Sequence, residues 1–161
     1  MPEIHYKPGD ATTPSVKGPK LIAHLCNDRG GWGRGFVLAI SARWPEPEKA
    51  YRKWYRERST NDFALGAVQV VQVAPPHHRI WVANMVGQHG VKTGSAGPPV
   101  RYDAIDQCLK NLADRALELE ASVHMPRIGC GLAGGKWERI EPLISARLCD
   151  LDISVTVYDH T

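Results

Sequence analysis

The sequence LIAHLCNDRGGWGRGF, residues 21–36, joins an apolar run to a glycine-rich turn and then to a segment with helical period. Residues 21–26 are mostly apolar, which predicts a buried strand. The turn at residues 27–35 contains four glycines, and helical period begins at Phe36. Such a turn places free main-chain N–H groups at the positive end of a helix dipole, which suits a phosphate or diphosphate. Glycine is favoured there because a side chain would block close approach of the ligand.

A second strand with a glycine-rich turn occurs where SVHM, residues 122–125, leads into PRIGCGLAGGK, residues 126–136. Taken alone, the first turn could equally be an ordinary connection between a strand and a helix. It has neither the spacing of the Rossmann dinucleotide fingerprint nor that of a P-loop. Two such turns favour a phosphate-bearing ligand, because neighbouring strands would place both turns on the rim of one cleft.

The rest of the chain alternates strand and helix patterns. Further strands are expected at residues 68–73, 80–85 and 153–158, with a weak one at 4–6. Apolar residues at helical spacing predict helices at residues 36–44, 48–56, 103–120 and 137–149, with Pro142 in an early turn of the last. Strands interleaved with helices predict an α/β fold with three layers, in which helices cover both faces of a central mixed sheet. We expect a single domain over residues 1–161, with a long loop at residues 87–99.

Composition narrows the class of protein. The 161 residues are 43% hydrophobic and 23% charged, with a formal net charge of +3, which is ordinary for a globular domain and too weak for a dedicated nucleic-acid binder. The four cysteines lie far apart and are expected to be reduced thiols. No run is long and apolar enough for a membrane span, so a cytoplasmic protein without a membrane partner is expected. No cofactor and no metal site are indicated.

The turns also carry a recognisable combination of residues. Gly9-Asp10 follows the first strand, the turn at residues 27–35 follows the second, and MPRIGCGL at residues 125–132 precedes Trp137. This combination, with the closing strand at residues 153–158, resembles the macrodomain family over nearly the whole chain. The chain is most similar to the terminal ADP-ribose protein glycohydrolase branch. The resemblance implies a three-layer α/β/α macrodomain that binds ADP-ribose.

The resemblance also assigns residues to the parts of ADP-ribose. Asp10 would hydrogen-bond the adenine amino group and Ala11 would help to fix the ring, although Asp10 could also be a turn cap. Tyr158 and His160 would flank adenine, and they could equally be ordinary surface residues. The first loop would wrap the distal ribose and the second would cradle the diphosphate through main-chain N–H groups. The assigned loop residues are Asn27, Trp32, Gly33, Arg34, Gly35 and Phe36 in the first loop, and Pro126, Ile128, Gly129, Cys130, Gly131, Leu132 and Ala133 in the second.

The chain departs from this branch at its catalytic positions. The branch uses an aspartate where this chain has Ala133, and a lysine near the end of the strand at residues 80–85, where this chain reads MVGQH. We do not assign that role to Lys92, so the covalent lysine mechanism is not expected. Hydrolysis would then use a positioned water, with Asn27 orienting the ribose. Candidate catalytic residues are Asn27, Asp28, Gln88 and His89.

Several functions remain open on these residues. Hydrolysis of mono-ADP-ribose is favoured over a non-catalytic ADP-ribose reader because no recruiting domain is attached. A phosphatase acting on ADP-ribose that carries a terminal phosphate is a third class. His24, inside an apolar strand, is interpreted as a hydrogen-bonded core histidine rather than a catalyst. Cys130 is interpreted as important for its backbone and small size, because no activating base is evident.

A basic stripe is predicted on one helix, formed by Lys49, Arg52, Lys53 and Arg56 at helical spacing. Nearby glutamates favour a solvated face. Some relatives in the resembling branch remove ADP-ribose from DNA bases as well as from protein carboxylates. The expected partners are therefore ADP-ribose or ADP-ribosylated protein, with ADP-ribosylated DNA as a further hypothesis in which the stripe guides the phosphate backbone.

Overall fold

The chain builds one mixed sheet. The structure is a computed structural model that describes residues 3–73, 75, 79–90, 99–131 and 133–159. Within these residues, six strands lie in the order β1-β6-β5-β2-β4-β3, with β3 antiparallel to β4 and the other neighbours parallel. The strands are β1 (His5–Pro8), β2 (Lys20–Asn27), β3 (Val68–Gln72), β4 (Ile80–Gln88), β5 (Ser122–Pro126) and β6 (Val155–Asp159).

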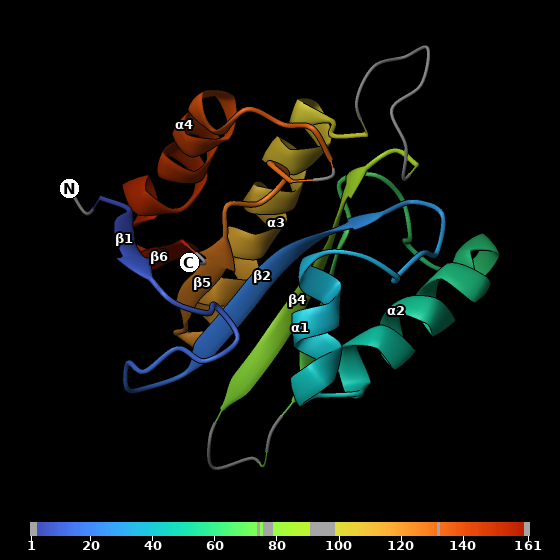
Figure 1. Ribbon diagram of the computed structural model, residues 1–161, viewed down its shortest axis with the longest axis horizontal. Helices are drawn as coiled ribbons and strands as arrows, with labels where there is room; N and C mark the ends of the chain where they lie inside the picture. Colours follow the sequence, from blue (N-terminus) through green and yellow to red (C-terminus); the bar gives the residue numbers. More distant parts are fainter. Residues whose placement is uncertain (1–2, 74, 76–78, 91–98, 132, 160–161) are drawn as a thin grey trace.

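Helices cover both faces of the sheet (Figure 1). The helices are α1 (Phe36–Arg43), α2 (Glu46–Arg56), α3 (Tyr102–Leu119) and α4 (Trp137–Arg147). One buried cluster joins α3 and α4 to one face, and a second joins α1 and α2 to the other. The expected three-layer α/β/α architecture with a central mixed sheet is therefore confirmed. No helix among the described residues combines the length and the apolar character needed to cross a membrane.

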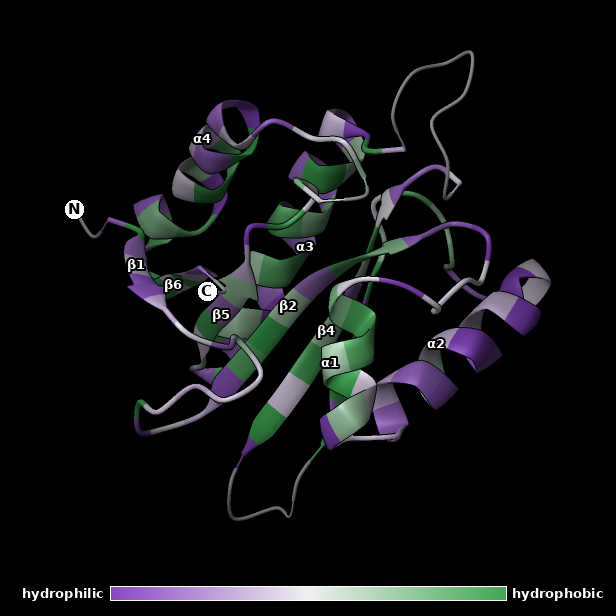
Figure 2. Cartoon of the chain, viewed as in Figure 1, coloured by the Kyte–Doolittle hydropathy of each residue, from purple (hydrophilic) through white to green (hydrophobic). Residues whose placement is uncertain are grey.

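Strand β2 shows how the sequence divides between the two layers. Leu21 and Ala23 point into the cluster with α3 and α4, whereas Ile22 and Cys26 point into the cluster with α1 and α2. This alternation follows from the two-residue period of a strand. Each fully buried Leu or Ile stabilises the fold by about 1.5–3 kcal/mol. Figure 2 shows the resulting contrast between the apolar central strands and the polar outer surface of α2.

Most predicted elements are confirmed, and the differences occur at their ends. Strand β4 extends to Gln88, because it stays paired with β2 as far as Asn27. Strand β6 begins at Val155 rather than residue 153, because Asp152 adopts a left-handed conformation with φ 62°. Helix α4 ends at Arg147, and Pro142 lies inside it at its sixth residue. A separate 3-10 turn, Cys149–Leu151, follows.

The topology brings the two glycine-rich loops together. Strand β2 is hydrogen-bonded to β4 on one side and to β5 on the other, all in parallel. The carboxyl ends of these three strands therefore meet at one edge of the sheet, where α/β proteins usually bind ligands. The first loop, residues 27–35, leaves β2 at this edge, and the second loop, residues 126–136, leaves β5 there.

Candidate functional site

A cleft of about 470 Å³ opens between the two loops at the carboxyl ends of β2, β4 and β5. Its wall contains residues from both loops together with the end of β4 and the middle of β2. The expected site residues that line it are Asn27, Trp32, Gly33, Arg34, Gly35, Phe36, Gln88, Pro126, Ile128, Gly129, Gly131 and Ala133. The cleft also includes His24, Leu25, Cys26, Gly31, Val37 and Arg127 in its lining.

The second loop contains main-chain donors without partners among the described residues, at positions that line the cleft. The N–H groups of Ile128, Gly129 and Gly131 donate no hydrogen bond to any described residue. Gly129 adopts φ 76°, and a Cβ atom there would lie 3.1 Å from Cδ1 of Ile140, so this position requires glycine. A Cβ atom on Gly131 would meet no atom within 4 Å. Free N–H groups beside open space form a wall that an anionic group can approach closely.

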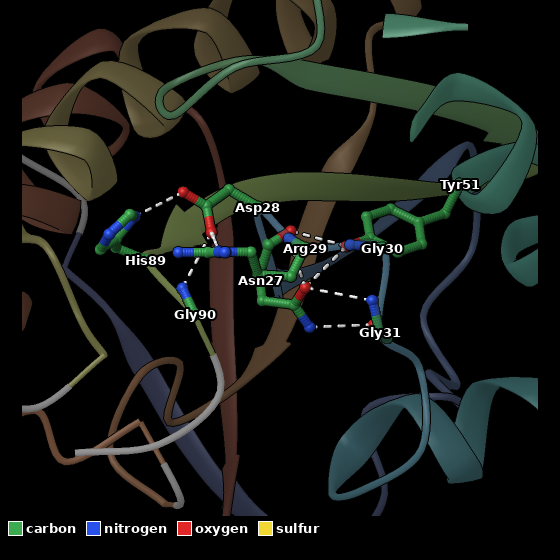
Figure 3. A network of polar contacts seen from close by, with 8 residues as sticks. All are labelled: Asn27, Asp28, Arg29, Gly30, Gly31, Tyr51, His89 and Gly90. Carbon is green, nitrogen blue, oxygen red and sulfur yellow. Dashed lines mark hydrogen bonds and ion pairs between the residues drawn. The ribbon is translucent and has the colours of Figure 1, made fainter. Parts of the chain in front are cut away.

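Asn27 organises the first loop from within (Figure 3). Its Oδ1 accepts hydrogen bonds from the N–H groups of Arg29 at 2.8 Å and Gly31 at 3.1 Å, and its Nδ2 donates to the Gly31 carbonyl. The Tyr51 hydroxyl donates to the Asn27 carbonyl at 2.6 Å and accepts from the Gly30 N–H at 3.1 Å. Tyr51 is fully buried on α2, and burial raises the pKa of its hydroxyl. Sequence reasoning did not identify Tyr51, although it anchors the loop.

Asp28 and His89 form a clasp between the first loop and the end of β4 (Figure 3). The His89 Nδ1 lies 2.6 Å from Asp28 Oδ2, and the Gly90 N–H donates to Asp28 Oδ1 at 2.8 Å. Burial favours the neutral carboxyl, but the Gly90 N–H and the His89 ring outweigh it, so the pKa of Asp28 is lowered. Neither side chain is among the residues that line the cleft. These two catalytic candidates therefore contact each other and do not line the cleft.

Gln88 lies beside Asn27 at the rim of the cleft. The two residues are register partners at the ends of β4 and β2. Gln88 is half-buried and lines the cleft. Of the four catalytic candidates, Asn27 and Gln88 are thus the two that line the cleft.

His24 is among the residues that line the cleft and is 1% exposed. Its Nε2 lies 2.6 Å from Asn84 Oδ1, and its ring packs edge-on against Trp32 and beside Phe36. Its burial agrees with the interpretation as a core histidine. Its Nδ1, however, is buried without a hydrogen-bond partner among the described residues, so that interpretation holds for one ring nitrogen only. A buried polar atom without a partner costs about 1–3 kcal/mol.

Two further residues of the second loop carry polar side chains. Cys130 is half-buried, and burial raises the pKa of its thiol, an effect that Arg127 only partly opposes. A raised pKa disfavours the nucleophilic thiolate, in line with a main-chain role for this position. The Arg127 guanidinium bonds Asp159 at 2.5 Å from Nε to Oδ1 and thereby ties the loop to the end of β6.

The residues expected at adenine lie beyond the cleft wall. Asp10 follows β1 at the same sheet edge, and its Oδ1 accepts hydrogen bonds from both the N–H and the hydroxyl of Thr12. Ala11 is buried. Tyr158 is 5% exposed, and its hydroxyl lies 2.8 Å from Nδ1 of His124. The described residues that line the cleft do not include these three. Leu132, His160 and Lys92 lie outside the described residues.

The predicted basic stripe is exposed on the outer face of α2. Arg52 pairs with Glu48 at 2.9 Å and donates to the Gly30 carbonyl at 3.1 Å. One member of the stripe therefore braces the first loop, while Tyr51 and Trp54 form the buried side of the helix.

The chain matches the Macro domain family over residues 23–144 and belongs to it. A macrodomain protein from Streptomyces coelicolor is 65% identical in structure comparison, with a TM-score of 0.87, and the match covers 99% of this chain and 100% of that one. The chain is 32% identical to chromodomain-helicase-DNA-binding protein 1-like of Danio rerio, across 96% of its own length but only 15% of that relative's. It is 26% identical to the ADP-ribose 1''-phosphate phosphatase of Lodderomyces elongisporus, covering 97% of this chain and 99% of the relative.

Proposed function

We propose that the cleft binds ADP-ribose and that the protein hydrolyses mono-ADP-ribose from modified protein carboxylates or DNA bases. The observation that carries this proposal is that the N–H groups of Ile128, Gly129 and Gly131 donate to no described residue, in a loop that lines the same cleft as Trp32 and Phe36. N–H donors suit a diphosphate, and aromatic rings suit the apolar face of a sugar. Membership of the macro domain family and a relative named for an ADP-ribose phosphate support the same ligand.

In the proposed pose, the diphosphate lies on the second loop and the distal ribose lies between Asn27 and Phe36. Adenine extends along the sheet edge toward Asp10, Ala11 and Tyr158. Oδ2 of Asp10, which has no hydrogen bond to a described residue, would accept a hydrogen bond from the adenine amino group, because Oδ1 already accepts two from Thr12.

The proposed reaction is hydrolysis at the anomeric carbon of the distal ribose. The bond from that carbon to the leaving carboxylate oxygen breaks, the oxygen of a water bonds to the carbon, and one water proton is released to solvent. The carboxylate leaves with the bonding electron pair. Such a leaving group needs little acid assistance, so positioning the water and shielding the cationic transition state can suffice. Gln88 and Asn27 line the cleft where that water would be held.

The experiment that tests the proposal begins with calorimetric titration of ADP-ribose. The same preparation is then assayed for release of ADP-ribose from glutamate-modified protein and from thymine-modified DNA. Binding with release supports the hydrolase, whereas binding without release leaves a reader of ADP-ribose. Absence of binding overturns the proposed ligand.

A second candidate is a phosphatase that acts on ADP-ribose 1''-phosphate, favoured by the name of the Lodderomyces elongisporus relative. Its product is inorganic phosphate. A phosphate-release assay with that substrate therefore separates it from hydrolysis at the anomeric carbon.

Modified DNA as a substrate can be tested by the dependence of the rate on salt. The exposed basic stripe on α2 would contact the phosphate backbone, and such contacts weaken steeply as salt rises. A rate on modified oligonucleotides that does not change with salt argues against this substrate. In that case modified protein carboxylates remain the proposed target.

A further inference from the structure

The tautomer of His24 is determined by a chain of hydrogen bonds through the sheet. Asn84 Nδ2 donates to the Pro47 carbonyl at 3.1 Å and to Gln69 Oε1 at 3.0 Å. Gln69 Nε2 in turn donates to the Ala50 carbonyl at 3.1 Å. Because carbonyl oxygens only accept, both amides have one possible orientation.

Asn84 must therefore present Oδ1 to His24 as an acceptor. The hydrogen of the neutral imidazole consequently sits on Nε2, 2.6 Å from that oxygen. Burial lowers the pKa of His24 to about 4, so the ring carries a single hydrogen at neutral pH. The opposite nitrogen, Nδ1, is then a bare acceptor, and it has no partner among the described residues.

We propose that Nδ1 of His24 accepts a hydrogen bond from a hydroxyl of the distal ribose and so selects ligands that carry this sugar. The inference rests on the proposed function and deepens it. His24 lines the cleft next to Trp32 and Phe36, and its free nitrogen is more than nine-tenths buried. His24 acts as a positioning residue for the ligand.

The chemistry of the site selects a hydroxyl as the donor. A phosphate of the ligand is ionised at neutral pH and offers only acceptors, which a bare nitrogen repels. Of the donors on ADP-ribose, the adenine amino group is assigned to Asp10, at the other end of the sheet edge. A sugar hydroxyl donates one hydrogen, and its carbon skeleton suits the two aromatic rings beside His24.

The first loop must shift slightly for this bond to form. Nδ1 is buried in the absence of ligand, with Trp32 from the loop and Phe36 from the start of α1 packed on the imidazole. Gly33 and Gly35 interrupt that loop, and neither would meet an atom within 4 Å at Cβ. Open space therefore borders the loop at these two glycines.

The test compares ADP-ribose with ADP, which keeps adenosine and the diphosphate but lacks the distal ribose. Titrations use the wild type, His24→Phe and the matched control His124→Phe. His124 is equally buried in the same sheet, but both of its ring nitrogens have partners, Ser122 and Tyr158. We expect His24→Phe to lower the affinity for ADP-ribose about tenfold, the effect of one hydrogen bond, and to leave ADP within about twofold. The control should keep the wild-type ratio of the two affinities.

A second measurement needs no variant. In ¹⁵N NMR of the wild type, Nδ1 of His24 should give the signal of an unprotonated nitrogen, which moves toward the hydrogen-bonded position with ADP-ribose and not with ADP. The role of His24 is overturned if His24→Phe loses affinity for ADP-ribose and for ADP to the same extent. It is also overturned if Nδ1 carries a proton in the wild type. If the wild type binds neither nucleotide, the proposed ligand itself fails.

Discussion

His24 Nε2 and Asn84 Oδ1 lie 2.6 Å apart, on residues that are direct register partners of the parallel strands β2 and β4. Both residues are buried, so the sheet holds a neutral imidazole in its interior. A second buried histidine, His124, lies on β5 between Ser122 and Tyr158. The pKa of each ring is lowered to about 4, in both cases chiefly by burial. These two residues link the stability of the fold to pH.

We expect the free energy of unfolding to fall as the pH is lowered from about 6.5 to about 4. The unfolded chain takes up a proton on each histidine below about pH 6.5, whereas the folded chain takes it up only near pH 4. Each ring therefore contributes up to about 3 kcal/mol to the free energy of unfolding. This contribution is fully present above about pH 6.5 and is lost as the pH falls toward about 4. Urea denaturation at several pH values in this range measures the loss.

Substitution of one histidine supplies the control. His124→Phe should lose about half of the pH dependence, because one of the two titrating rings is gone. Asp28, Asp106 and Asp159 have pKa values lowered below 3.8, so their titration falls outside this range. A free energy of unfolding that stays constant down to about pH 5 would contradict the prediction.

Gly131→Glu should abolish ligand binding and leave the fold intact. A Cβ atom at Gly131 would meet no atom within 4 Å, so we expect the fold to accept a side chain there, and that side chain would enter the cleft that Gly131 lines. The added carboxylate repels a diphosphate, and we expect a loss of affinity for ADP-ribose of about 100-fold or more, roughly 3 kcal/mol. Calorimetry measures the affinity, and the melting temperature reports the fold. Retention of wild-type affinity would show that the diphosphate lies elsewhere.

Tyr51→Phe should weaken binding without removing a group that touches the ligand. The Tyr51 hydroxyl donates to the Asn27 carbonyl and accepts from the Gly30 N–H. Its loss removes both hydrogen bonds to the first loop and costs about 1–2 kcal/mol of stability. We expect a three- to tenfold loss of ADP-ribose affinity, to order of magnitude. Tyr55→Phe is the matched control on the same helix, because the Tyr55 hydroxyl has no hydrogen bond among the described residues. Equal affinities for the two variants would exclude a role for the Tyr51 bonds.

The sequence predicts the layers and the two loops because these depend on local patterns. Apolar spacing identifies α3 and β6, and glycines at residues 129 and 131 identify the wall of the cleft. The residues that contact the cleft and its loops from other elements depend instead on how strands and helices are placed in three dimensions. Tyr51 reaches Asn27 across 24 positions, and His24 reaches Asn84 across 60, so neither contact follows from a local pattern.

The interpretation of His24 illustrates the same limit. Its apolar surroundings along the chain correctly indicate burial. Whether both ring nitrogens are satisfied depends on Asn84 and Gln69, which come from two other strands. Similarly, the stripe on α2 was visible in the sequence, but the contact of Arg52 with the Gly30 carbonyl required the fold.

The two remaining polar candidates at the end of β4 can be separated by turnover. Gln88 lines the cleft next to Asn27, whereas His89 is exposed and pairs with Asp28. If a positioned water hydrolyses the ribosyl bond, Gln88→Ala should slow release of ADP-ribose about 10- to 100-fold, because the water loses a fixed partner. The affinity for ADP-ribose should change less than about threefold, since Gln88 then acts mainly in the transition state.

His89→Ala is the control and should keep the wild-type rate. Single-turnover release from glutamate-modified protein measures both variants. A slow His89→Ala with an unaffected Gln88→Ala would instead assign the assisting role to the imidazole of the Asp28 clasp.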